Sequence, residues 1–124
     1  MEGQEDVVIF NKMVKDLGKD LNGNFFGWGV GGAAKMRAFL MLFRDLGYKH
    51  VAAILDGDKA RDAEILASEF MNYKIITLIT DDIRDKKDRQ IQAKAGIADE
   101  KGKFKENYRT YIINLINEIN AALI

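Results

Sequence analysis

The sequence contains no cysteine, no proline and a single histidine, His50. The absence of cysteine excludes disulfides, zinc–thiolate sites and cysteine nucleophiles. One histidine argues against a multi-histidine metal site and against a histidine-based catalytic triad, and we expect His50, which precedes an apolar run, to lie on the surface. A metal bound by this chain would therefore be a hard cation with oxygen ligands, in practice Mg²⁺, Mn²⁺ or Ca²⁺.

A surplus of charge and a long apolar run are also missing. The 19 basic and 19 acidic side chains give a net charge of zero. Nucleic-acid-binding proteins usually carry a basic surplus, so this balance argues against a free-standing binder. It leaves room for a catalytic module whose partner domains hold the DNA. No run approaches the ~20 apolar residues of a membrane span, and no signal peptide is visible, so we expect a cytoplasmic protein without a membrane partner.

Two periods of hydrophobic residues alternate along the 124 residues, which suit one domain covering residues 1–124 with a real core. Helical spacing is seen at residues 5–17, 33–46, 59–72 and 106–123, and short apolar runs typical of buried strands at 24–30, 51–55 and 75–79. The polar residues 84–105 predict a short helix with a solvated face at 84–89, then a turn around Gly102. This alternation predicts an α/β fold with a parallel sheet.

Acidic residues follow the predicted strands directly. Asp56-Gly57-Asp58 comes after the run 51–55, and Asp81-Asp82 comes after the run 75–79. Ligands of parallel sheets bind beyond the carboxyl ends of the strands, so these carboxylates should gather where chemistry normally occurs. Crowded carboxylates repel one another, and a bound cation removes that penalty. Each cluster alone is equally typical of solvated loop acids or of charges at a helix N-terminus.

Three motifs together resemble the Toprim domain of topoisomerases, bacterial primases and several nucleases. They are Glu2-Gly3-Gln4-Glu5-Asp6, Gly29-Val30-Gly31-Gly32 and Asp56-Gly57-Asp58-Lys59. The stretch 96–103, followed by a helix rich in Glu and Tyr, is most similar to the OLD-type (overcoming lysogenisation defect) ATP-dependent nucleases. The resemblance covers essentially the whole chain. It implies a three-layer, Rossmann-like domain in which helices flank a small parallel sheet.

The resemblance also implies a set of metal ligands and an activity. Glu2 would be a general acid/base or a metal ligand, and Asp6 would be a further ligand with a catalytic role. Asp56 and Asp58 would hold Mg²⁺ or Mn²⁺. The implied activity is metal-dependent phosphoryl transfer, the nicking or cleavage of DNA by an endonuclease module.

Other residues of the implied nuclease site are less sharply defined by the sequence. A late acidic residue would be Asp82 or Asp85, and a late lysine would be Lys103 or Lys105. Phosphate groups of DNA would contact Gly31, Gly32, Lys35 and Lys59.

One element of the resembled family has no counterpart here. In that family the first glutamate ends an apolar strand, whereas only Met1 precedes Glu2. We therefore expect the chain to be a fragment of a larger protein, with an ATPase domain in the parent protein, and a homo-oligomer is compatible with the sequence. The missing strand would leave a gap in the sheet and would leave Glu2 poorly placed unless another segment supplies it.

Two other functions fit parts of the sequence. Residues 27–32 match the G-x-G-x-x-G fingerprint of dinucleotide-binding domains, with Asp56 at the end of the next strand. A receiver-like phosphoacceptor domain would use Glu5-Asp6 as its acidic pair, Asp56 as phosphoacceptor, Thr80 as switch hydroxyl and Lys103 as amine. Both alternatives leave Asp58 without a role.

Overall fold

The computed structural model describes residues 1–25, 29–86 and 93–124, and in them it is a mixed α/β structure. None of the helices in this part of the chain has the length and apolarity to cross a membrane. The helices are α1 (Gln4–Asp16), α2 (Ala33–Asp45), α3 (Ala60–Glu69) and α4 (Arg109–Ala122), with short 3₁₀ turns at Gly57–Lys59 and Glu106–Tyr108. The strands are β1 (Ala52–Leu55), β2 (Lys74–Thr77), β3 (Asp82–Arg84) and β4 (Gly96–Ala98).

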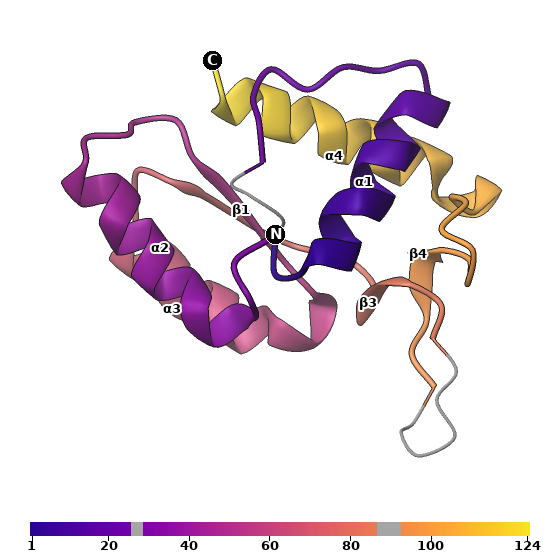
Figure 1. Ribbon diagram of the computed structural model, residues 1–124, viewed down its shortest axis with the longest axis horizontal. Helices are drawn as coiled ribbons and strands as arrows, with labels where there is room; N and C mark the ends of the chain where they lie inside the picture. Colours follow the sequence, from indigo (N-terminus) through magenta and orange to yellow (C-terminus); the bar gives the residue numbers. More distant parts are fainter. Residues whose placement is uncertain (26–28, 87–92) are drawn as a thin grey trace.

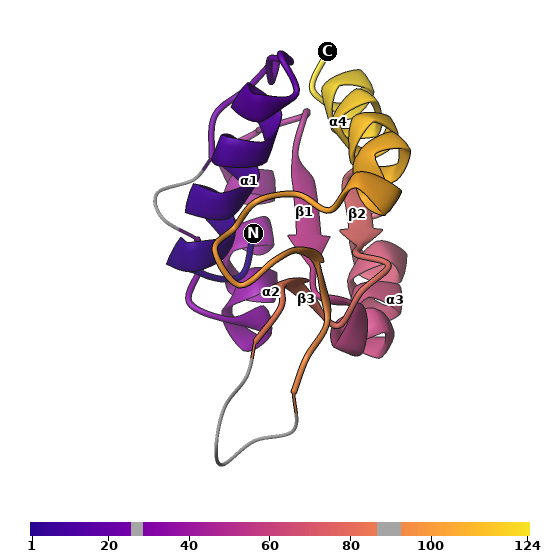
Figure 2. The same cartoon turned by 90° about the vertical axis from the view of Figure 1, so that its right-hand side faces the viewer.

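Helices cover both faces of the parallel pair β1–β2 (Figures 1 and 2). The strands pair from Ala52↔Lys74 to Leu55↔Thr77. Successive side chains of a strand point to opposite faces, so Ala53 and Leu55 pack with α2 and α3, while Ile54 packs with α1 and α4. Burial on both faces explains why this strand reads as a continuous apolar run. The predicted α/β class with flanking helices is confirmed at this level.

The four predicted helices form close to their predicted bounds, and most of their apolar stripes are buried. Phe10 and Met13 of α1 are completely buried. Gly18 and Gly47 follow α1 and α2 with φ of 65° and 86°, the left-handed conformation that ends a helix. Leu46 is the last residue of the predicted helical stretch 33–46, but α2 ends at Asp45. The Leu46 side chain is 64% exposed and does not join the buried stripe.

The segment 24–30 was predicted to be a strand and is not one in its described part. Residues 24, 25 and 30 have no strand assignment, and Gly29 forms only an isolated bridge; residues 26–28 lie outside the described residues. Val30 N–H instead donates to Met1 O at 3.1 Å. Glycines at 29, 31 and 32 with positive φ bend this backbone around the N-terminus, which explains why an extended strand does not continue here.

The polar region 84–105 was wrongly predicted to begin with a helix. Residues 84–86 and 93–105 contain no helix; they contribute to the parallel strands β3 and β4, which pair Asp82 with Gly96 and Arg84 with Ala98. Arg84 is therefore a strand residue, and the rest of the predicted helix face at 87–89 lies outside the described residues. Strands of three residues are too short to show a period of two, so this pair had no sequence signal. The predicted turn is confirmed, with φ of 84° at Gly102.

An apolar cavity of about 550 Å³ lies beside β1. Its walls include Met1, Val30, Ala52 and Ile54, together with side chains of α2 and α4.

Candidate metal centre

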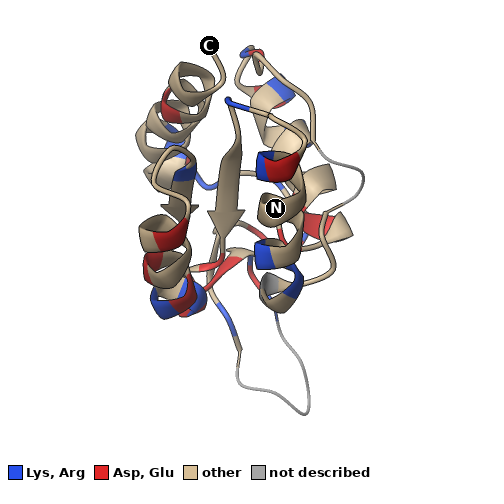
Figure 3. Ribbon diagram, turned by 90° about the vertical axis from the view of Figure 1, so that its left-hand side faces the viewer, with Lys and Arg blue, Asp and Glu red and all other residues tan. Residues whose placement is uncertain are grey.

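Carboxylates from three elements meet beyond the carboxyl end of β1. Asp56 follows β1 directly, Asp82 begins β3, and Asp6 lies in the first turn of α1. One carboxylate oxygen from each lies within 4.8 Å of the other two. In Figure 3 several ribbon segments coloured red for Asp and Glu lie at this end of the strands. Asp6 and Asp82 are buried, so the arrangement offers three oxygen ligands to one hard cation in a partly enclosed place.

Local hydrogen bonds fix the two buried aspartates. Gly3 N–H donates to Asp6 Oδ2 at 3.1 Å, which caps the N-terminus of α1 and places the carboxylate at the positive end of the helix. Ile83 N–H donates to Asp82 Oδ1 at 2.7 Å, and Thr80 Oγ1–H donates to Asp82 O at 2.6 Å. Both carboxylates are therefore held in position by the backbone of their own segment.

Glu2 is held firmly, contrary to the expectation of poor placement. It is only 8% exposed, and its Oε2 accepts a hydrogen bond from Asp56 N–H at 2.6 Å. Its carbonyl oxygen accepts hydrogen bonds from Gly31 N–H and Gly32 N–H, both at 2.9 Å. The glycine turn and the end of β1 thus do the positioning that a preceding strand was expected to do.

The same hydrogen bonds change the interpretation of the glycine turn. Gly31 and Gly32 were predicted to contact DNA phosphates, but their N–H groups bind Glu2. Gly31 and Gly32 have positive φ angles of 86° and 110°, a conformation that only glycine adopts readily. These angles aim both N–H groups at one oxygen. Lys35, also predicted to contact phosphate, is exposed and its side chain lies over this turn. Lys59, the fourth residue of that prediction, lies in the turn after β1, where its N–H donates to Asp56 O at 2.9 Å. In this structure the turn positions a candidate ligand rather than presenting free donors.

Asp58 and the alternative late residues lie outside the three-aspartate group. Asp58 is exposed in the 3₁₀ turn, and its Oδ2 bonds to Lys94 Nζ at 2.9 Å. Asp85 instead bonds to Lys105 Nζ at 2.7 Å, and Asp99 accepts a hydrogen bond from Lys103 N–H at 3.0 Å. Of the two late acids that the sequence left open, Asp82 is the one that joins Asp6 and Asp56.

Two carboxyl groups of the three-aspartate group, those of Asp56 and Asp6, have raised pKa values. Burial raises the pKa of Asp56 to about 8, with further contributions from the charges of Asp6, Glu2, Asp82 and Asp58. Burial also raises the pKa of Asp6, although the hydrogen bond from Gly3 acts in the opposite direction. Without a cation, the Asp56 carboxyl therefore keeps its proton near neutral pH. A bound divalent cation would replace that proton.

Gly57 is required by close packing and not by a left-handed backbone conformation. Its φ is not in the left-handed region. Its N–H donates to Thr80 O at 2.9 Å, and a Cβ here would lie 2.8 Å from Leu78 O and closer still to Thr80 O. The backbone between Asp56 and Asp58 therefore lies directly against the segment that leads to Asp82.

Gly57→Ala is expected to separate these two segments. The free energy of unfolding should fall by about 1–3 kcal/mol, and the affinity for Mn²⁺ should fall as Asp56 moves away from Asp82. Urea unfolding and calorimetric titration would measure both. Gly3→Ala is the matched control, because its Cβ would meet Asp6 Oδ2 at an ordinary 3.5 Å. Equal losses in the two variants would contradict the role of the Gly57 contact.

Residues of the two alternative functions lie in several different surroundings. Glu5 bonds to Arg84 on the surface, while Asp6 is buried, so the acidic pair of a receiver is split. The Thr80 hydroxyl, its switch group, donates to a backbone carbonyl. For the dinucleotide fingerprint, Gly27 and Trp28 lie outside the described residues, and no strand is assigned to residues 24, 25 and 30 beside them.

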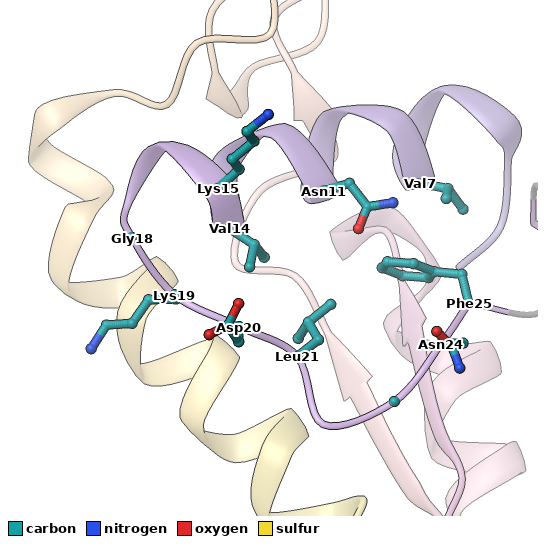
Figure 4. Close-up of a pocket in the computed structure, with 11 residues that line it drawn as sticks. Val7, Asn11, Val14, Lys15, Gly18, Lys19, Asp20, Leu21, Asn24 and Phe25 are labelled. Carbon is teal, nitrogen blue, oxygen red and sulfur yellow. The ribbon is translucent and has the colours of Figure 1, made fainter.

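A separate hollow of about 700 Å³ lies between α1 and the segment 18–25 (Figure 4). Phe25 packs edge-on against Phe10 below it, with ring centroids 6.1 Å apart. None of Asp6, Asp56 and Asp82 lines this hollow. It is a surface depression where a loop packs on a helix, and the candidate chemistry lies elsewhere.

Comparison with known proteins does not add to this geometry. No protein-family model, no curated protein and no solved structure matches the chain. What the chain does is therefore inferred from its motifs and from the side chains that the fold brings together.

Proposed function

We propose that this chain is a divalent-metal-dependent phosphoryl-transfer domain that nicks or cleaves DNA, as in the OLD-type nucleases that its motifs resemble. The convergence of Asp6, Asp56 and Asp82, with an oxygen of each within 4.8 Å of the others, is the observation that supports it most directly. Three carboxylates and no nearby histidine or cysteine form a donor set that suits Mg²⁺ or Mn²⁺.

The three aspartates would hold the cation, and their partial burial would limit competition from water. A divalent cation bound there polarises a phosphoryl oxygen and lowers the pKa of a bound water. Glu2 is fixed next to the group through its hydrogen bond from Asp56 N–H. This fourth carboxylate would act as the general base that accepts a proton from the attacking water. Asp58 would become an additional ligand if it left Lys94.

The choice of DNA as substrate rests on the resemblance and on chemistry. A phosphodiester is a stable, anionic ester, and its hydrolysis needs both charge neutralisation and an activated water, which a carboxylate-held cation supplies together. The net charge of zero indicates that this chain alone would bind DNA weakly.

Asp82→Asn tests the proposed function at the late acidic residue that lies with Asp6 and Asp56. We expect at least about a tenfold loss of Mn²⁺ affinity and a larger loss of plasmid nicking, because one charged ligand of three is removed. Calorimetry and conversion of supercoiled plasmid to nicked circles would measure them. The control is Asp81→Asn, the exposed neighbour. Wild-type protein that binds no Mg²⁺ or Mn²⁺, or equal behaviour of the two variants, would refute the metal centre.

A further inference from the structure

Lys86 bonds to Asp82 of the three-aspartate group, and Lys94 bonds to Asp58, which follows Asp56 by two residues. Lys86 Nζ lies 2.8 Å from Asp82 Oδ2 and 3.5 Å from Glu5 Oε2. Lys94 Nζ lies 2.9 Å from Asp58 Oδ2. The backbones of Lys86 and Lys94 form an antiparallel bridge. Lys86 N–H donates to Lys94 O at 2.9 Å, and Lys94 N–H donates to Lys86 O at 3.1 Å. Both lysine side chains therefore extend from the same backbone bridge, which lies between β3 and β4 in the chain.

The two partners of the Lys86–Asp82 pair differ sharply in exposure. The Asp82 side chain is 4% exposed, whereas the Lys86 side chain is 38% exposed. The Lys94 side chain is 39% exposed, and the side chain of its partner Asp58 is 32% exposed. Such an amine loses little when it turns to solvent, but the buried carboxylate then needs another cation. A divalent cation held by Asp6, Asp56 and Asp82 would provide that charge and would repel the nearby ammonium groups.

We propose that, when a divalent cation binds, Lys86 leaves Asp82 and Lys94 leaves Asp58. Both ammonium groups then bind phosphate oxygens of the substrate. This inference rests on the proposed function, since it concerns the same site. In the metal-free protein the two ammonium groups neutralise carboxylates that would otherwise repel one another. In the metal-bound protein they are released beside the cation, where an anionic phosphodiester would lie, and each adds one favourable contact to its backbone.

The exchange predicts opposite changes in two affinities. Lys86→Gln and Lys94→Gln each remove a competitor of the metal, so the double variant should bind Mn²⁺ about tenfold more tightly than wild type at low salt. The metal-loaded double variant should bind a labelled DNA duplex more weakly, measured with Ca²⁺ to slow cleavage. In a plot of log DNA affinity against log salt concentration, the slope for the double variant should be shallower than that for wild type by about two, one for each lysine.

The matched control is Lys74→Gln. Lys74 forms an equally short pair with Glu118, at 2.8 Å, but both side chains are about half exposed and the pair lies at the start of β2, away from the carboxylate group. Both affinities should be unchanged in this variant. Lys94→Gln alone loses only a pair with an exposed aspartate, so it should fold normally even if Lys86→Gln is unstable.

The outcomes separate this inference from the proposed function. If wild type binds Mn²⁺ and the lysine variants bind it equally well, the amines do not compete with the metal and the inference fails alone. It also fails if the metal-loaded wild type shows no salt-dependent DNA binding, or if the variants keep its salt dependence. If neither wild type nor the variants bind metal, the proposed function fails as well.

Discussion

Asp56→Asn is expected to make the metal-free protein more stable and, at the same time, unable to function. Asp56 has the most perturbed carboxyl of the described residues, with a pKa raised to about 8 by burial and by four neighbouring carboxylates. Ionising it in the folded state therefore costs free energy that an uncharged amide of the same shape does not cost. Allowing for its partial exposure to water, we expect a gain on the order of 2 kcal/mol near pH 8 without metal.

The same substitution removes one of the three candidate metal ligands. Asp56 is one of the three aspartates whose carboxylate oxygens lie within 4.8 Å of one another, and its N–H donates to Glu2. We expect Mn²⁺ affinity and plasmid nicking to fall by at least about a hundredfold, because loss of a direct ligand exceeds the usual effect of losing a supporting residue. Stability gained at the expense of activity is the behaviour of a strained functional site.

Thermal unfolding in EDTA, calorimetric titration with Mn²⁺ and a nicking assay would measure the two effects on one preparation. Asp81→Asn serves as control, since it removes the same charge from an exposed residue of the same loop. A stabilising effect of equal size in Asp81→Asn would point to general charge repulsion. A less stable Asp56→Asn protein with normal metal binding would contradict both roles of this carboxylate.

The sequence predicted the helices and the position of the site because both depend on local patterns. The apolar spacing of α1 and the run that forms β1 are visible in single segments, and an acidic residue after a parallel strand belongs at the ligand-binding edge. Asp56 was found in this way and Asp6 through the resemblance of its motif, and the structure places them together.

The parts that the sequence did not predict depend on contacts between distant segments. Asp82 could not be separated from Asp85, because the choice depends on how β3 pairs with β4 and on Lys105, which binds Asp85. The binding of the Gly31 and Gly32 N–H groups to Glu2 likewise joins residues about thirty positions apart. Side-chain type and spacing do not encode such pairings, whereas packing of the folded chain does.

Stability of the metal-free protein is expected to fall as the pH rises from about 5 to about 8. The pKa values of Asp56 and Asp6 are raised in the folded state above their ordinary value of 3.8, so the folded protein binds more protons than the unfolded chain in this range. The stabilising contribution of a raised carboxyl pKa is complete below the unfolded value and is lost as the pH rises through the folded value. For Asp56 this loss continues to about pH 8.

A divalent cation should reverse this dependence. Because metal replaces the proton on Asp56, its affinity rises with pH, and metal at about a hundred times its dissociation constant would add about 2.7 kcal/mol. The difference in unfolding free energy between saturating Mn²⁺ and EDTA should therefore widen from about pH 5 to about pH 8. Urea unfolding at several pH values, with and without Mn²⁺, would measure it.

One group acts in the opposite direction and needs a control. Burial lowers the pKa of the Met1 amine, whose stabilising contribution is present above its ordinary value and is lost as the pH falls through its folded value. Asp56→Asn keeps this amine, so the difference between wild type and Asp56→Asn isolates the carboxyl. That difference should grow with pH in EDTA. If it is flat between about pH 5 and about pH 8, Asp56 does not carry the proton that the metal is expected to displace.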